Sequence, residues 1–107
     1  MALIRPIPVS GSGYTTATKH SSQYATGTQR SISCTIGDII TITESSTGGT
    51  SDTISLTSIT GATTLESSVG TVNSLYALNA TSNTITYTIT TSGSSGYVTE
   101  RYIIVEK

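Results

Sequence analysis

The sequence predicts an all-β fold, a small antiparallel β-sandwich, from its composition and from the alternation of its side chains. The chain has 107 residues, of which 23 are threonine and 18 are serine, while only 10% are charged. Threonine, isoleucine and tyrosine favour strands, whereas threonine and serine are mediocre helix formers. Several short stretches alternate large apolar residues with threonine, as strands with one buried face do. The length fits a single domain.

The charge and the apolar runs of the sequence argue against nucleic-acid and membrane partners. The chain has five Lys and Arg and six Asp and Glu, for a net charge of −1, and no two cations are adjacent. Nucleic-acid binding through phosphate neutralisation requires clustered cations, so we expect no nucleic-acid partner. No apolar run approaches the ~20 residues that span a bilayer, so we expect no membrane partner either.

The first part of the chain differs from the rest and is expected to be an extended arm and long loop over residues 1–29, ahead of a sandwich over residues 30–107. Pro6 and Pro8 restrict the apolar stretch around them to an edge strand or an arm, because proline lacks the N–H of a sheet ladder. A secretory signal needs about 7 to 15 apolar residues near the start, and the prolines interrupt this stretch earlier. The polar residues 11–30 are predicted to be a loop, with one irregular strand near 14–19.

After Arg30, apolar and polar side chains alternate more regularly along the chain. Residues 31–36 place apolar side chains on one face, which predicts a buried thiol for Cys34, the only cysteine. Residues 38–44 place two acids on the same face as two isoleucines, and Ile42 is predicted to point inward. Acidic residues at strand ends are commonly solvated, so we expect the acids there to face water. The side chains assigned to these two faces are Ile32, Cys34 and Ile36, and then Asp38, Ile40, Ile42 and Glu44.

The middle of the chain is less regular. Residues 52–59 place Ile54 and Leu56 inward, and Gly61 ends that element. Residues 63–66 are predicted to be a short strand that carries Leu65. A helical turn near residues 73–78 is suggested by the helical spacing of Val72, Leu75, Tyr76 and Asn79.

The end of the chain carries the strongest alternation. Ile85, Tyr87 and Ile89 alternate with threonines in residues 83–91, and residues 97–105 form a second alternating stretch. Five small residues separate the two stretches, which predicts a closing β-hairpin.

Residues 38–107 resemble an immunoglobulin-like or PKD-like β-sandwich. The resemblance rests on Gly37-Asp38-Ile39-Ile40-Thr41-Ile42-Thr43, which is similar to an early core strand of such modules, and on the stretches Thr84–Thr90 and Tyr102–Val105, which are similar to their last two strands. True immunoglobulin domains carry a buried tryptophan and a pair of cysteines. This sequence has no tryptophan and only one cysteine. The resemblance therefore favours an immunoglobulin-like sandwich, with a jelly roll or a small barrel as alternatives.

The whole profile also resembles the decoration, or cement, proteins of tailed-phage capsids. It combines a short chain, an arm ahead of a sandwich, low charge and no catalytic residue set. Fold-level analogy of this kind is associational. The resemblance implies a virion protein on the capsid surface, made in the host cytoplasm without a signal peptide.

Catalytic chemistry finds little support in the sequence. His20 is the only histidine, and a triad of Ser22, His20 and Asp38 is one of many combinations that 18 serines allow. We expect His20 to be a solvated loop residue and the chain to have no catalytic site. Zinc would need clustered cysteines and histidines, and calcium a dense run of acids. We therefore expect no metal and no cofactor.

The sequence thus predicts a non-enzymatic virion structural protein, a phage capsid decoration protein that docks on the assembled shell. Its expected partners are the major capsid protein, further copies of itself, or both. The alternative is a carbohydrate-binding or adhesion module, for example in a phage tail or fibre, with Tyr97 facing a glycan. The residues expected to dock on the partner are Leu3, Ile4, Ile7, Val9, Tyr14 and Tyr24.

Overall fold

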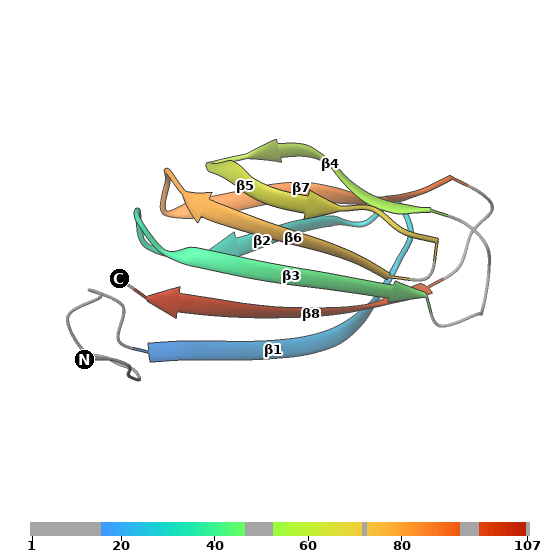
Figure 1. Ribbon diagram of the computed structural model, residues 1–107, viewed down its shortest axis with the longest axis horizontal. Helices are drawn as coiled ribbons and strands as arrows, with labels where there is room; N and C mark the ends of the chain where they lie inside the picture. The colour runs from blue at the N-terminus through green and yellow to red at the C-terminus, as the bar shows by residue number, and fades with distance from the viewer. Residues whose placement is uncertain (1–15, 47–52, 72, 93–96, 107) are drawn as a thin grey trace.

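The protein is an all-β sandwich of two antiparallel sheets (Figure 1). The computed structural model describes residues 16–46, 53–71, 73–92 and 97–106. No helix in these ranges is long and apolar enough to cross a membrane. The five-stranded sheet has the order β1 (Thr16–Ala25), β8 (Tyr97–Glu106), β3 (Ile39–Ser46), β6 (Asn73–Ala80) and β5 (Ala62–Ser68). The three-stranded sheet has the order β2 (Gln29–Ser33), β7 (Thr84–Thr91) and β4 (Ile54–Thr60).

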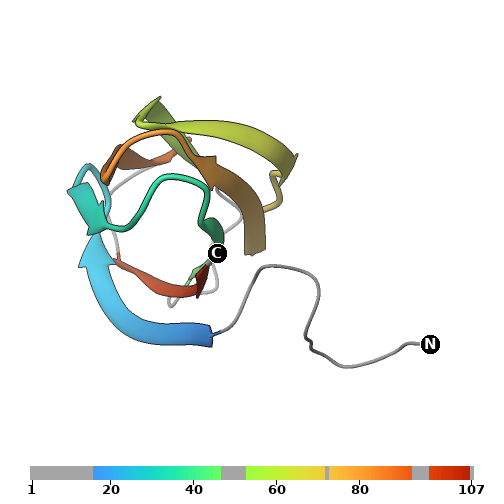
Figure 2. The same cartoon turned by 90° about the vertical axis from the view of Figure 1, so that its left-hand side faces the viewer.

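The two sheets curve around a shared core, as the view along the strands shows (Figure 2). Side chains of a strand alternate between its two faces, so every second residue of a core strand is buried. The predicted inward faces of residues 38–44, 52–59 and 83–91 are confirmed. The buried apolar side chains are Ile32, Ile40, Ile42, Ile54, Leu56, Tyr76, Leu78, Ala80, Ile85, Tyr87, Ile89, Val98 and Ile104.

The strand order is that of a jelly roll, with two nested Greek keys. The chain is folded back on itself so that β1 pairs with β8, β2 with β7 and β3 with β6. Rolling this long hairpin also brings β3 beside β8 and β4 beside β7. An immunoglobulin sheet instead joins the first, second, fifth and fourth strands. The predicted sandwich is confirmed, and its strand order corresponds to the jelly-roll alternative, with β5 attached to β6.

The predicted closing hairpin is wrong. β7 pairs with β2 and β4 in one sheet, whereas β8 pairs with β1 and β3 in the other. The connection between the two strands therefore crosses from one sheet to the other. Alternation and a short polar connection are shared by hairpins and by such crossings, so these features do not distinguish them.

Two other local predictions are corrected. Residues 16–25, expected to be mostly loop, form the ten-residue strand β1, which pairs along its full length with β8. The sandwich therefore includes residues that we had assigned to the arm. Residues 73–80 form the strand β6 and not a helical turn. Its inward residues include Ser74 and Ala80, and these small side chains hide the alternation in the sequence.

Burial of some side chains also differs from expectation. Ile36 is 61% exposed, because β2 ends at Ser33 and Ile36 lies in the turn closed by the hydrogen bond from the N–H of Asp38 to the carbonyl oxygen of Thr35. Leu65 is 56% exposed at an irregularity of β5. Cys34 is only half-buried; its thiol donates a hydrogen bond to the carbonyl oxygen of Ser82 at 3.4 Å. Burial and then the charge of Asp38 raise the pKa of this thiol, which keeps it protonated.

The turn between β4 and β5 requires glycine. Gly61 has a φ of +81°, a conformation that L-residues rarely adopt. A Cβ atom there would lie 2.1 Å from the carbonyl oxygen of Thr84. The predicted end of the element at Gly61 is confirmed, and the chain passes there from the three-stranded to the five-stranded sheet.

Replacing Ile42 by Asp should unfold the protein. The Ile42 side chain is fully buried between the sheets, and an unpaired charge is costly there. We expect a loss of about 4 kcal/mol or more in the free energy of unfolding, measured by thermal or urea denaturation. Thr63→Asp adds the same charge at an exposed position of β5 and should melt like the parent. A normal melting transition for Ile42→Asp would contradict the inward placement.

Candidate functional site

Four polar side chains form a cluster inside the sandwich, and we call them the Glu100 cluster: Arg30, Glu44, Tyr87 and Glu100. The Glu100 carboxylate accepts a hydrogen bond from Nε of Arg30 at 2.8 Å and another from the hydroxyl of Tyr87 at 2.5 Å. Arg30 and Tyr87 lie on β2 and β7 of one sheet, and Glu100 lies on β8 of the other. The cluster therefore joins the two sheets through the core.

Strand register explains why two acids meet in the core. Glu100 alternates with the buried Val98 and so points inward, and Glu44 follows Ile42 on the inward face of β3. The register of β3 and β8 sets Glu44 directly opposite Glu100. Directly opposite residues have Cβ atoms about 4.5–5.5 Å apart, so the two carboxyl groups are neighbours. Both side chains are fully buried.

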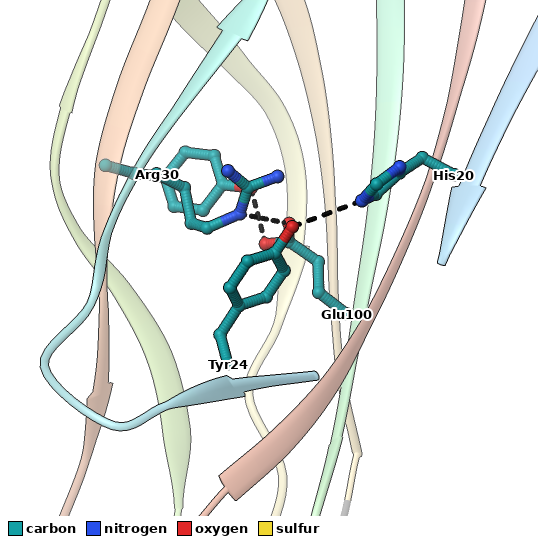
Figure 3. Close-up of polar contacts among 5 residues, drawn as sticks. His20, Tyr24, Arg30 and Glu100 are labelled. Atoms are coloured by element: carbon teal, nitrogen blue, oxygen red, sulfur yellow. Dashed lines mark hydrogen bonds and ion pairs between the residues drawn. The ribbon is translucent and has the colours of Figure 1, made fainter. Parts of the chain in front are cut away.

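The cluster continues outward to β1 through Tyr24 and His20 (Figure 3). The guanidinium carbon of Arg30 lies 4.1 Å from the centre of the Tyr24 ring, a cation–π contact. The hydroxyl of Tyr24 is hydrogen-bonded to Nε2 of His20 at 3.1 Å. His20 also stacks on Tyr102, with ring centres 4.9 Å apart. The chain of contacts thus runs from the half-buried His20 to the fully buried Glu100.

Burial and the neighbouring charges set the protonation of the cluster. Burial first, and then the adjacent Glu100 carboxylate, raise the pKa of Glu44 to about 10, so this side chain is neutral at pH 7. Burial opposes the charge on Arg30, but the hydrogen bond and the charge of Glu100 outweigh it and raise the pKa of Arg30. Burial and Glu100 also raise the pKa of Tyr87, which remains a donor. One ion pair and one neutral acid result.

Glu44 is the member of the cluster that makes no hydrogen bond to the described residues, although its carboxyl group adjoins that of Glu100. Neither of its carboxyl oxygens has a hydrogen-bond partner there. An unsatisfied buried polar group costs about 1–3 kcal/mol. The expectation that Glu44 is solvated is therefore wrong, and so is the same expectation for Asp38, which is also buried.

The Glu100 cluster has the residue types of a glycosidase site but not its access. Paired carboxyl groups cleave glycosides when a sugar lies between them. Here Glu44 and Glu100 have no exposed surface, so no substrate reaches them. The geometry instead fits a structural role: a charge-assisted contact in the core that fixes how one sheet sits on the other.

Of the triad considered from the sequence, Ser22 and His20 both lie on β1, whereas Asp38 precedes β3. His20 lies on β1, half-buried, and contacts Tyr24 and Tyr102, so the expectation of a solvated loop histidine is wrong. Asp38 lies in the turn before β3, where its carboxylate accepts a hydrogen bond from the backbone N–H of Thr35 at 2.9 Å. Among the described residues, no three His, Cys, Asp or Glu side chains gather that could hold a metal ion.

The predicted docking residues have mixed outcomes. Leu3, Ile4, Ile7, Val9 and Tyr14 lie outside the described residues. Tyr24 is half-buried; it packs against the core and over Arg30. Tyr97, at the start of β8, is 61% exposed. Its predicted role toward a glycan stays a prediction.

The outer face of the five-stranded sheet carries an apolar patch that the sequence analysis did not identify. Its members are partly exposed and point away from the core, because each alternates with buried residues on β3, β6 or β8. Ile39 is the register partner of Val105, and Thr41 lies between Ala77 and Ile103. We call this surface the apolar outer face, and define it by Ile39, Leu75, Ala77, Ile103 and Val105.

The outer face of the three-stranded sheet, unlike that of the five-stranded sheet, is polar. Every outward residue of its strands is uncharged and carries a hydroxyl or an amide. Two cross-strand hydroxyl pairs join β4 to β7, between Thr57 and Thr90 at 2.9 Å and between Thr60 and Thr86. This hydroxyl face comprises Gln29, Ser31, Ser33, Ser55, Thr57, Thr60, Thr84, Thr86, Thr88 and Thr90.

Comparison with known proteins gives no relative: no protein family, no curated protein and no solved structure matches this chain.

Replacing Glu44 by Gln should flatten the dependence of stability on pH. Between the ordinary glutamate pKa of 4.5 and about 10, folded Glu44 retains a proton that the unfolded chain releases. Stability therefore falls as pH rises through this range, by up to ~1.4 kcal/mol per pH unit. Glutamine does not titrate, so the variant should gain stability relative to the parent as pH rises, measured by urea denaturation from pH 6 to pH 8.5.

Glu66→Gln is the matched control, because Glu66 is an exposed acid on β5. Its stability should follow that of the parent across the same range. A constant difference between Glu44→Gln and the parent at every pH would contradict a neutral buried Glu44.

Replacing Arg30 by Met should destabilise the protein by about 3–5 kcal/mol, because the buried Glu100 carboxylate then loses its cation. The double variant Arg30→Met, Glu100→Met leaves no unpaired charge and should recover much of this loss in denaturant titrations. Arg101→Met, at an exposed position next to Glu100, should change stability by less than about 0.5 kcal/mol. Equal small effects of Arg30→Met and Arg101→Met would show that the ion pair does not hold the sheets together.

Proposed function

We propose that this protein is a non-enzymatic structural protein of a virion, a phage capsid decoration protein that docks on the assembled shell and stabilises it. The observation that carries the proposal is the contrast between its two outer faces. Ile39, Ile103 and Val105 lie together on one face, and the opposite face has only hydroxyl and amide side chains. A protein with one side against a protein surface and one side in water needs such a contrast.

The apolar outer face suits docking because its residues are already fixed. They lie on β3, β6 and β8, the central strands of the five-stranded sheet, so binding orders few side chains. Interface cores are depleted in charged residues, and the register sets Ile39 beside Val105 and Thr41 between Ala77 and Ile103. Asn79 pairs with Ile39, and Lys19 of the edge strand β1 pairs with Ile103. Arg101 lies at the border of the patch, where a polar rim is usual.

The fold and the lack of accessible chemistry support the same proposal. Jelly rolls occur in viral capsid and lectin domains, although this is an argument from fold analogy. The only paired carboxyl groups that the structure describes are buried and out of reach of a substrate. The proposal places the chain on the capsid surface after synthesis in the host cytoplasm, with the major capsid protein as partner.

Stabilisation of the shell would follow from mass action. A protein that binds the assembled shell but not the free subunits favours assembly by the free energy of that binding. In this proposal, the apolar outer face supplies the rigid contact, and Leu3, Ile4, Ile7 and Val9 add contacts to neighbouring subunits. The hydroxyl face would then form the outside of the particle.

A second candidate is a carbohydrate-binding or adhesion module, and one observation favours it. Tyr97 presents a ring that is 61% exposed at one end of β8, as sugar-binding aromatic residues do. Lectin domains also use the jelly roll. This candidate places the chain in a tail or fibre and gives it a glycan as partner.

The docking proposal predicts that purified phage particles contain this chain in many copies, as measured by mass spectrometry. Recombinant protein should bind particles that lack it and raise their melting temperature. Ile103→Lys places a charge in the apolar outer face and should weaken binding by about tenfold or more. Thr88→Lys adds the same charge to the hydroxyl face and should bind like the parent.

The absence of the chain from particles, or equal binding by both lysine variants, would contradict the docking proposal. Specific binding to glycans that Tyr97→Ala abolishes would favour the second candidate instead.

A further inference from the structure

We propose that the free edge of β5 binds residues 3–9 of a second copy of this chain as an added antiparallel strand. The proposal concerns self-association of the protein and does not rest on docking to a shell.

β5 provides the acceptor because its outer edge is open. It is the last strand of the five-stranded sheet and pairs only with β6 among the strands that the structure describes. Residues 63–68 are exposed on both faces. An edge strand presents a row of unpaired N–H and C=O groups, and proteins usually protect such edges with lysine, proline or a cover. β5 has neither lysine nor proline, and the regular stretches on either side of its register shift between Thr64 and Glu66 offer backbone groups for strand addition.

The side chains of this edge also suit an apolar strand. Leu65 is 56% exposed, and Val69, just beyond the end of β5, is 50% exposed. The only charge on β5 is the exposed Glu66. A matching strand would therefore be largely apolar and carry a cation.

Residues 3–9 have these properties. The segment reads Leu-Ile-Arg-Pro-Ile-Pro-Val, with Arg5 as its only charge, and its seven residues equal the length of β5. Its two prolines are two residues apart, so both missing N–H groups point to the same side of an extended strand. The other side keeps the N–H groups of Leu3, Arg5, Ile7 and Val9. Such a strand can pair on one side only, as an added edge strand does.

Chain length favours a second copy over the same molecule. β1 and β5 are opposite edges of one sheet, and both begin at the same end of it (Figure 1). A strand added antiparallel to β5 would end five strand spacings from Thr16, or about 24 Å along the sheet. The seven steps from Val9 to Thr16 span about 23–25 Å when fully extended. Within one molecule, a link that follows the outer surface of the sheet would be almost fully extended, whereas a neighbouring copy imposes no such limit.

The resulting contact is head-to-tail. Each molecule donates a strand from the segment before β1 and accepts one at β5, so the two contact surfaces differ. Contacts of this kind form closed rings when the rotation between copies closes, and filaments when it does not.

The test uses the isolated protein in size-exclusion chromatography with light scattering, over a dilution series. The full chain should show oligomers that dissociate on dilution. A chain lacking residues 1–9 retains the acceptor only, and Leu65→Lys, Glu66→Lys retains the donor only. Each variant should be monomeric alone, and an equimolar mixture of the two should form a one-to-one heterodimer.

The control variant Ser31→Lys, Thr88→Lys carries two lysines on the hydroxyl face and should assemble like the parent. Melting curves show whether each variant is folded, since Leu65 and Glu66 are exposed and neither substitution disturbs the core. A full chain that is monomeric at every concentration, or two folded variants that do not associate when mixed, would overturn the proposal. Either result would leave the comparison of Ile103→Lys with Thr88→Lys in particle binding unchanged. Failure of the self-association proposal is therefore distinguishable from failure of the docking proposal.

Discussion

The arrangement of the two sheets depends on the Glu100 carboxylate, which receives hydrogen bonds from Arg30 and Tyr87 of the opposite sheet. Apolar packing is not directional, and a core rich in isoleucine does not by itself define how one sheet lies on the other. Hydrogen bonds to a buried charge have strict geometry and are costly to lose. A neutral hydrogen bond also joins the sheets, since the backbone N–H of Leu56 on β4 donates to the hydroxyl of Tyr76 on β6.

The same constraint accounts for the unusual state of Glu44. It lies directly opposite Glu100, and two neighbouring buried carboxyl groups cannot both be charged at low cost. Arg30 balances one negative charge, so Glu44 retains its proton. A cavity at this place would have made the pair a candidate for acid–base chemistry. Because both side chains are fully buried, Glu100 instead holds the two sheets together through its hydrogen bonds, and Glu44 makes the stability of the protein depend on pH.

The outer surface divides into parts that suit different contacts. The hydroxyl face has threonine methyl groups that fit the pleat and hydroxyls that remain hydrated, so it stays in water without charge. The apolar outer face around Ile103 offers a rigid surface to a partner, and the open edge of β5 offers backbone groups to an extended strand. The proposed decoration role would use both kinds of contact, one to the shell and one to neighbouring copies.

Which residues of each strand face inward follows from the order of the amino acids, since side chains alternate in any strand whatever its partners. Ile40, Ile42 and Ile85 were assigned correctly on that basis. The same alternation places Glu44 on the buried face. The general tendency of acidic residues to be exposed predicts the opposite, and for Glu44 that prediction is wrong. Which strands pair, and hence that Glu44 lies opposite Glu100, is visible only in the folded molecule. Pairing depends on contacts between residues far apart in the chain, and a local pattern carries no information about them.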